Sequence, residues 1–279
     1  MTVDEPLQPQ DLVVTLLGTY VRPFGVGPVW SGGLVELLGE FGFSVGAARV
    51  ALTRLVRRDL ISRVRSGRLV HYCVTPRCDR LLAEGDGRIF SLGTARASSD
   101  GWTVVWHQIP EDRRLERSRL GRRLRFLGFG PVQEGVWVSP HDHVLEVDQL
   151  LRDLQVESAA TTFLASVGAS SGLPALVARA WDLSGLVERY ESFVREFKPF
   201  LRRTLDDADA FLVRTRLMHL FRGFPFVDPE LPEELAPIGR PRAAAVEIFH
   251  AVYSRLADGS QRHFDAAVAG VPVGAGASV

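Results

Sequence analysis

Arginine side chains recur at helical spacing between residues 45 and 58. Arg49, Thr53 and Arg57 are each four residues apart, so a helix would place all three on one face. An arginine can hold the O6 and N7 atoms of guanine with two hydrogen bonds, which contributes about 1–3 kcal/mol of discrimination between bases. Arg49, near the start of such a helix, is best placed to reach a base edge, and Thr53 is next. The spacing therefore favours a helix that enters the major groove of duplex DNA.

Further basic residues continue this pattern. Arg54, Arg57 and Arg58 lie later in the same helix and suit phosphate contacts, which position a protein on DNA without reading bases. The complete set of predicted DNA contacts is Arg49, Val50, Thr53, Arg54, Arg57, Arg58, Arg65, Arg68 and His71. The alternative for each of these residues is an ordinary solvated side chain.

Charge is unevenly distributed along the chain. There are 33 basic and 33 acidic residues, which give a formal net charge of zero. Residues 44–80 nonetheless contain nine arginines and two aspartates, a net charge of +7. Because a phosphate backbone responds to the local potential, the zero total does not exclude DNA binding.

Three short helices would hold the arginine face in place. The apolar spacing predicts one helix over 11–21, with Asp11 as its N-cap, and a second over about 30–42. The third follows Ser44 as its N-cap and runs to about Arg58. Its side toward the core is formed by Ala48, Leu52 and Leu55.

A β-hairpin is predicted directly after the third helix. Two alternating segments, 60–65 and 69–74, flank a turn at Ser66-Gly67. Helix, turn, helix and basic hairpin in this order are typical of a winged helix-turn-helix. The wing would bring three basic side chains beside the minor groove or the DNA backbone: Arg65, Arg68 and His71.

A different pattern begins after residue 100. Strand, helix, strand, strand, helix and strand are predicted over 102–109, 111–127, within 128–135, 136–138, 144–154 and 159–167. This β-α-β-β-α-β order implies a ferredoxin-like domain with an antiparallel sheet and two helices on one face. The preceding residues 81–100 are predicted to form a connector.

The last third of the chain is predicted to be helical. Helices are expected over 173–180, 184–200, 207–221 and 241–256. We therefore expect an α+β protein with a winged helix over 1–92, a ferredoxin-like domain over 93–172, a helical domain over 173–265 and a flexible tail over 266–279.

Several classes of protein are disfavoured by composition and motifs. No apolar run reaches the roughly 18–20 residues of a membrane span, and two cysteines suit a reducing cytoplasm. Phosphate-binding loops, nucleophile elbows and dinucleotide fingerprints are absent, so neither an enzyme nor a cofactor is expected. His141 and His143 flank Asp142, but a further metal ligand at suitable spacing is missing.

The chain resembles the PaaX family, bacterial repressors of phenylacetic acid degradation. The resemblance covers nearly the whole chain and is carried by LGTYVR at 17–22, ARVALTRLVRR at 48–58, VWVSP at 136–140, RTRLMH at 214–219 and DPELP at 228–232. It implies a cytoplasmic homodimer with a winged helix, a Cas2-like middle domain of ferredoxin type and a helical C-terminal domain. It also implies release from operator DNA by a small effector such as phenylacetyl-CoA or a related acyl-CoA or aryl acid.

Two positions depart from the family pattern. Asp59 stands where the family usually has glycine, and Ile238-Gly239-Arg240 replaces an expected tryptophan. The second departure lies in the domain expected to bind the effector, so the resemblance supports DNA reading more strongly than it supports a particular ligand.

Polar residues on two further helices have open interpretations. Arg214, Arg216, His219 and Arg222 either bind the polar end of the effector or form hydrogen bonds between domains. Seven arginines over 113–125 form either an anion site for coenzyme A phosphates, a second DNA contact, or a solvated face paired with nearby acids. The alternative to a repressor is a Cas2-like metal-dependent nuclease, which needs acidic ligands at the end of the first middle-domain strand, where Trp106-His107-Gln108 offers none.

Overall fold

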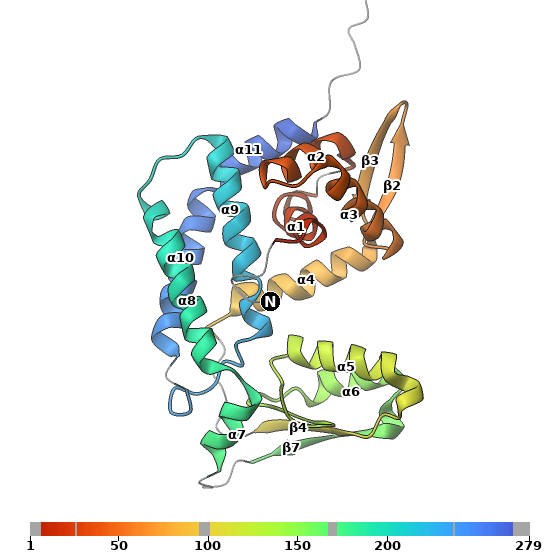
Figure 1. The fold of residues 1–279 in the computed structure, drawn as a ribbon, viewed down its shortest axis with the longest axis vertical. Helices are drawn as coiled ribbons and strands as arrows, with labels where there is room; N and C mark the ends of the chain where they lie inside the picture. Colours follow the sequence, from red (N-terminus) through yellow and green to blue (C-terminus); the bar gives the residue numbers. More distant parts are fainter. Residues whose placement is uncertain (1–6, 26, 95–100, 167–171, 237, 270–279) are drawn as a thin grey trace, which may run out of the picture. The chain divides into compact units, whose positions relative to one another are not determined.

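The computed structural model describes residues 7–25, 27–94, 101–166, 172–236 and 238–269. The chain forms two compact units (Figure 1). The first combines residues 1–88 with 195–222 and 248–279, and the second combines 89–194 with 223–247. The spatial units therefore do not follow the order of the chain, because segments from the last third complete the unit that contains the N-terminal helices.

The first unit begins with a helix whose α-helical part is followed by further helical turns of other types. The α-helix α1 (Pro9–Leu16) continues through a π-helical segment, Leu17–Val21, into a 3-10 turn. Gln8 occupies the N-cap position, so the prediction of Asp11 as N-cap is wrong. Proline suits the first position of a helix, since its missing N–H needs no partner there, and the N-cap lies three residues upstream of the predicted one.

Helix α2 (Ser31–Glu40) ends as the sequence predicts. Gly42 has a φ of 85°, and its N–H donates to Gly39 O at 2.9 Å, while Phe43 N donates to Leu38 O at 3.2 Å. These two bonds form a Schellman motif, in which a left-handed residue satisfies the last carbonyls of a helix. The turn leads directly into α3 (Val45–Arg57).

A three-stranded sheet follows α3. Strands β2 (Ile61–Ser66) and β3 (Leu69–Val74) form the predicted hairpin, but Ser66 pairs with Leu69, so the turn is Gly67-Arg68, one residue later than predicted. A two-residue strand, β1 (Val29–Trp30), pairs with the other edge of β3. The sequence did not reveal β1, because two residues are too few to show an alternating pattern.

The predicted connector contains a helix. Thr75 accepts a hydrogen bond from Cys78 N at 3.2 Å and begins α4 (Pro76–Ser91). The connector prediction is therefore wrong over 81–91. Gly85 and Gly87 weaken the local helical signal. Burial of an apolar face formed by Cys78, Leu82 and Ile89 offsets the low helix propensity of these glycines.

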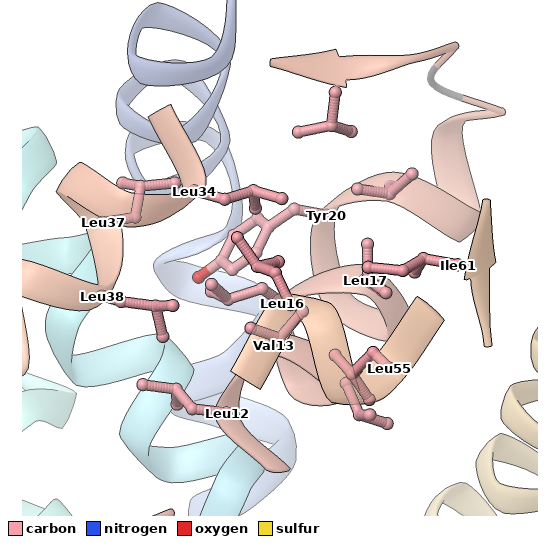
Figure 2. Packing of buried hydrophobic residues seen from close by; sticks show 14 of the residues in the cluster. Leu12, Val13, Leu16, Leu17, Tyr20, Leu34, Leu37, Leu38, Leu55 and Ile61 are labelled. Carbon is pink, nitrogen blue, oxygen red and sulfur yellow. The ribbon is translucent and has the colours of Figure 1, made fainter. Parts of the chain in front are cut away.

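Tyr20 lies at the centre of the first unit's core (Figure 2). Its ring stacks on Phe264 at a centroid distance of 5.0 Å and tilts against Phe211 at 5.4 Å. Phe211 belongs to α9 (Asp207–Phe221) and Phe264 to α11 (Ala257–Val268), so the C-terminal helices close the core of the N-terminal segment. Helix α11 reaches Val268, which is buried, so the first three residues of the tail predicted over 266–279 belong to this helix. The rest of that tail, 270–279, lies outside the described residues.

Gly33 of α2 lies where α11 comes closest to it. A Cβ atom on Gly33 would lie 2.1 Å from Ala267 O and 2.9 Å from Val268 Cα. Because backbone atoms cannot rotate aside, we expect Gly33→Ala to lower the free energy of unfolding by about 1–3 kcal/mol. Gly39 on the same helix has no atom within 4 Å of an added Cβ, so Gly39→Ala should raise stability by up to about 1 kcal/mol. Urea unfolding followed by circular dichroism tests both, and equal midpoints for the two variants would contradict the close contact.

The second unit contains the predicted ferredoxin-like arrangement. Its elements are β4 (Trp102–His107), α5 (Arg114–Phe126), β5 (Gly130–Gln133), β6 (Val136–Ser139), α6 (Val144–Asp153) and β7 (Ala160–Ala165). The antiparallel sheet has the strand order β5-β6-β4-β7. Helices α5 and α6 lie on one face of it (Figure 1). Val105, Leu120, Trp137 and Val147 are among the buried residues between these helices and the sheet.

The remaining helices agree with the predicted positions to within about three residues. They are α7 (Leu173–Ala180), α8 (Leu183–Phe197), α9 and α10 (Gly239–Arg255). A 3-10 segment, Lys198–Leu201, accounts for the predicted extension of α8 to residue 200. Among the described residues, no helix combines the length and apolar character needed to cross a bilayer.

Candidate nucleic-acid interface

Helix α3 presents the predicted arginine face to solvent. Ser44 Oγ accepts a hydrogen bond from Ala47 N at 3.2 Å, which caps the helix as predicted. The side toward the core is buried and consists of Ala48, Ala51, Leu52 and Leu55. The opposite side is exposed and carries Arg49, Val50, Thr53, Arg54 and Arg57, with Arg58 just after the helix. The periodicity of the sequence thus predicts correctly which side chains face outward.

The exposed arginines of α3 form no ion pairs within the described part of the chain. No carboxylate among the described residues forms an ion pair with Arg49, Arg54, Arg57 or Arg58. Thr53 Oγ1 donates to Arg49 O at 2.9 Å, which leaves its oxygen lone pairs free to accept. The face therefore combines uncompensated positive charge with groups that can contact base edges and phosphates.

The hairpin adds arginines on one of its faces. Arg65 and Arg68 are exposed, as predicted for a wing. Arg63, which was not among the predicted contacts, is exposed too and lies two residues before Arg65, so both point to the same side of β2. His71 pairs with Val64, which places it on the opposite face, and it is only half exposed. The period-two spacing of Arg63 and Arg65 is the signal that identifies the additional residue.

Asp59 ends α3 in a left-handed conformation. Its φ is 56°, its N–H donates to Val56 O at 3.0 Å, and Leu60 N donates to Leu55 O at 3.0 Å. This is a Schellman motif whose left-handed position favours glycine, because a Cβ atom crowds the backbone there. The structure thus supplies the physical reason why a glycine is expected at this position.

Replacing Asp59 should affect stability and DNA binding separately. Asp59→Gly is expected to raise the free energy of unfolding by about 1 kcal/mol, since glycine adopts the left-handed conformation without strain. Asp59→Asn keeps the Cβ atom and should gain less. Both variants remove a negative charge beside the arginines of α3, so both should bind DNA more tightly than the wild type. Thermal unfolding and fluorescence anisotropy with labelled duplex measure the two effects, and tighter binding by Asp59→Gly alone would contradict the role of charge.

The predicted effector residues make contacts inside the first unit. Arg214 is 5% exposed, donates from Nε to Tyr253 O at 3.0 Å, and stacks 3.9 Å from the centroid of the Tyr253 ring. His219 is 3% exposed, and its Nδ1 lies 3.0 Å from Thr15 Oγ1. Both side chains therefore hold α9 against neighbouring helices.

The other two predicted effector residues are also paired. Arg222 donates from Nη1 to Thr15 Oγ1 at 2.8 Å and to Asp11 O at 3.3 Å. Arg216 is partly exposed and forms an ion pair with Glu196, with Nε 2.5 Å from Oε1. These contacts correspond to the second interpretation of the sequence, in which the polar residues of α9 tie C-terminal helices to the N-terminal segment. They do not converge on one open site.

His219 should make stability depend on pH. Burial, together with the nearby charges of Arg222 and Arg216, lowers its pKa to about 4 from an ordinary value of 6.5. The unfolded chain therefore binds a proton between pH 6.5 and 4 that the folded protein does not. The free energy of unfolding is lost as pH falls through this range, by about 1.4 kcal/mol per unit, or about 2 kcal/mol at pH 5. Urea midpoints at pH 7.5 and 5.0 should differ less in His219→Gln than in the wild type. His250→Gln, at an exposed histidine, serves as control, and equal pH dependence in both variants would contradict the assignment.

The second unit shows no metal centre among its described residues. No group of three or more histidine, cysteine, aspartate or glutamate side chains is arranged to hold a metal ion in the part of the chain that the structure describes. His141 Nε2 instead lies 3.0 Å from Pro229 O. At the end of β4, His107 is 7% exposed and accepts a hydrogen bond from Trp137 Nε1 at 3.3 Å. Burial lowers the pKa of His107, which keeps it a neutral acceptor within the fold.

Three family models match this chain, and similar proteins include a curated repressor and a solved structure. Residues 8–78 match the PaaX-like protein model, 95–177 the PaaX protein central Cas2-like domain, and 181–266 the PaaX-like protein C-terminal domain. The transcriptional repressor PaaX of Escherichia coli (strain K12) is 28% identical over 264 residues, which cover 90% of this chain and 81% of that protein. The solved structure of the uncharacterized protein Rv0674 from Mycobacterium tuberculosis is 26% identical, with a TM-score of 0.54, over 94% of this chain and 99% of that one. Three domain models in order, together with a relative that matches over most of both chains, show that this chain belongs to the PaaX family.

Proposed function

We propose that the protein is a transcriptional repressor that reads duplex DNA with a winged helix-turn-helix. The exposed, uncompensated arginine face of α3 is the observation that carries this proposal. Helices α2 and α3 joined by a four-residue turn, with a basic hairpin after α3, are the parts that such a module needs. The similarity to the repressor from Escherichia coli supports the same function. Arg49 and Thr53 would contact bases, and Arg54, Arg57, Arg58, Arg65 and Arg68 would contact phosphates.

Two copies of the chain would act together on an operator. A homodimer presents two α3 helices about 34–36 Å apart, or a multiple of this spacing, and so selects a pseudo-palindromic sequence. An effector such as phenylacetyl-CoA, or a related acyl-CoA or aryl acid, would bind the DNA-incompetent form more tightly and thereby release the operator. Arg214, Arg216, His219 and Arg222 would then respond through the packing of α9 rather than through an open pocket. Such a repressor would act in the cytoplasm and catalyse no reaction.

The Cas2-like nuclease alternative is not favoured. A metal-dependent nuclease needs carboxylates at the end of β4, and the residues there are Trp106, His107 and Gln108. His107 is already used inside the fold as an acceptor for Trp137. The middle domain has the fold of that enzyme family without its expected acidic ligands.

Binding to promoter DNA tests the proposal. Fluorescence anisotropy at 150 mM salt should show at least about 1,000-fold tighter binding to the promoter of the protein's own operon than to random duplex of equal length. Light scattering should give two chains per complex. Addition of aryl-CoA thioesters should release the DNA. Free coenzyme A and free aryl acids are tested in separate titrations. Equal and weak binding to both duplexes would overturn the proposal.

A further inference from the structure

Helix α5 presents several exposed arginines along its length. Arg114, Arg119, Arg122 and Arg125, named here the α5 basic face, are exposed and form no ion pair with any described carboxylate. Arg122 Nη1 donates to Ser118 Oγ at 2.8 Å, and the Arg125 guanidinium lies 5.0 Å from the centroid of the Trp137 ring. These contacts hold two of the side chains in place without neutralising their charge.

Other arginines of this region have structural roles. Arg113 donates to the carbonyl oxygens of Gln155 at 2.6 Å and Leu154 at 3.1 Å, where α6 ends. Arg117 forms an ion pair with Glu111. Folding of the unit thus accounts for Arg113 and Arg117, and the packing of α5 on the sheet is supplied by Leu120, Gly121 and Leu124. Neither the bonds of Arg113 and Arg117 nor the packing of α5 on the sheet accounts for the α5 basic face.

The α5 basic face carries an electrostatic cost. Within Arg114–Phe126 there are six arginines and one glutamate, a net charge of +5. Arg119 and Arg122 stand three residues apart, as do Arg122 and Arg125, and like charges at such spacing destabilise a helix. An anionic partner along the helix would relieve this repulsion. Eleven residues separate Arg114 from Arg125, a rise of about 16 Å, which equals the axial length of about five base pairs.

We propose that the α5 basic face is a second contact to the backbone of duplex DNA, distinct from α3. This inference rests on the proposed function, since it assumes that the protein binds duplex DNA. Phosphate contacts carry no base information. The face would therefore add affinity and salt dependence, and it would leave the choice of sequence to α3.

Salt dependence of binding tests the α5 basic face. The full-length variant Arg119→Gln/Arg122→Gln removes two of its charges and leaves the packed side of α5 intact. Arg152→Gln/Arg179→Gln removes two exposed arginines from other helices of the same unit and so matches the change in net charge. Binding to promoter duplex and to random duplex is measured by anisotropy between 50 and 300 mM KCl.

The expected result is a smaller salt slope for the α5 variant alone. Each lost phosphate contact lowers the magnitude of the slope of log K against log salt by about 0.9, so two contacts give about 1.8. Affinity for promoter and random duplex should fall by the same factor, while the control variant keeps the wild-type slope. Equal slopes in the two variants would overturn the inference. A second outcome would also overturn it: free coenzyme A raises the unfolding temperature of the wild type but not of the α5 variant, while DNA binding is the same in both. The face would then bind a small phosphorylated molecule. A wild type that does not prefer its promoter would instead refute the proposed function, whatever the slopes.

Discussion

Arg49→Ala should weaken binding to the operator about 10- to 100-fold and leave binding to random duplex almost unchanged. Arg49 is exposed near the start of α3, where a side chain reaches base edges, and one bidentate contact to guanine contributes about 1–3 kcal/mol. Arg49→Lys should not restore the affinity, since an ammonium group keeps the charge but cannot form the bidentate contact. Because the side chain is exposed and unpaired, the unfolding temperature should stay at the wild-type value.

Arg57→Ala provides the contrasting result on the same face. Arg57 lies two turns after Arg49 and is assigned to a phosphate, so its removal should weaken operator and random binding by the same factor and lower the salt slope by about 0.9. Anisotropy titrations with both duplexes at several salt concentrations distinguish the two roles. An Arg49→Ala variant that loses operator and random binding equally would show that Arg49 does not read bases.

Asp228→Ala should lower the free energy of unfolding by about 3–5 kcal/mol. The Asp228 side chain is fully buried and accepts from Arg242 Nε at 2.6 Å, Arg242 Nη2 at 2.8 Å and Tyr190 Oη at 2.5 Å. It therefore ties the loop after residue 226 to α8 and α10. Removing it leaves the Arg242 guanidinium, whose side chain is only 12% exposed, without its counter-charge. Burial and the Asp228 charge raise the pKa of Tyr190, so the phenol remains a hydrogen-bond donor at neutral pH.

Intrinsic fluorescence can follow this unfolding selectively. Trp102, Trp106, Trp137 and Trp181 belong to the second unit, and Trp30 to the first. Urea titrations of Asp228→Ala should show an earlier fluorescence transition, and Tyr190→Phe a smaller shift of about 1 kcal/mol. Asp207→Ala breaks the exposed pair with Arg262 and should leave the midpoint unchanged. Equal midpoints for Asp228→Ala and Asp207→Ala would contradict the importance of the buried pair.

Local patterns in the sequence determined the elements that carry the proposed chemistry. The outward face of α3, its Ser44 cap, the hairpin and the order of strands and helices over 102–165 all follow from spacings within about a dozen residues. Such spacings specify which side of a helix or strand is apolar, because side-chain direction repeats with the period of the element. The arginine face could therefore be identified before any tertiary contact was known.

Contacts between distant segments decided the rest. The helical state of 81–91 depends on the burial of Leu82 and Ile89, and the end of α11 on the burial of Val268 against the N-terminal core. A helical wheel does not reveal that the side chains of Arg214 and His219 are buried. The packing of α9 against α1, α10 and α11 encloses them, because the environment of a side chain depends on neighbours far away in the chain. The sequence by itself thus determined that α3 exposes an arginine face. The tertiary structure decided that the four polar residues of α9 considered for an effector form hydrogen bonds and ion pairs within the protein.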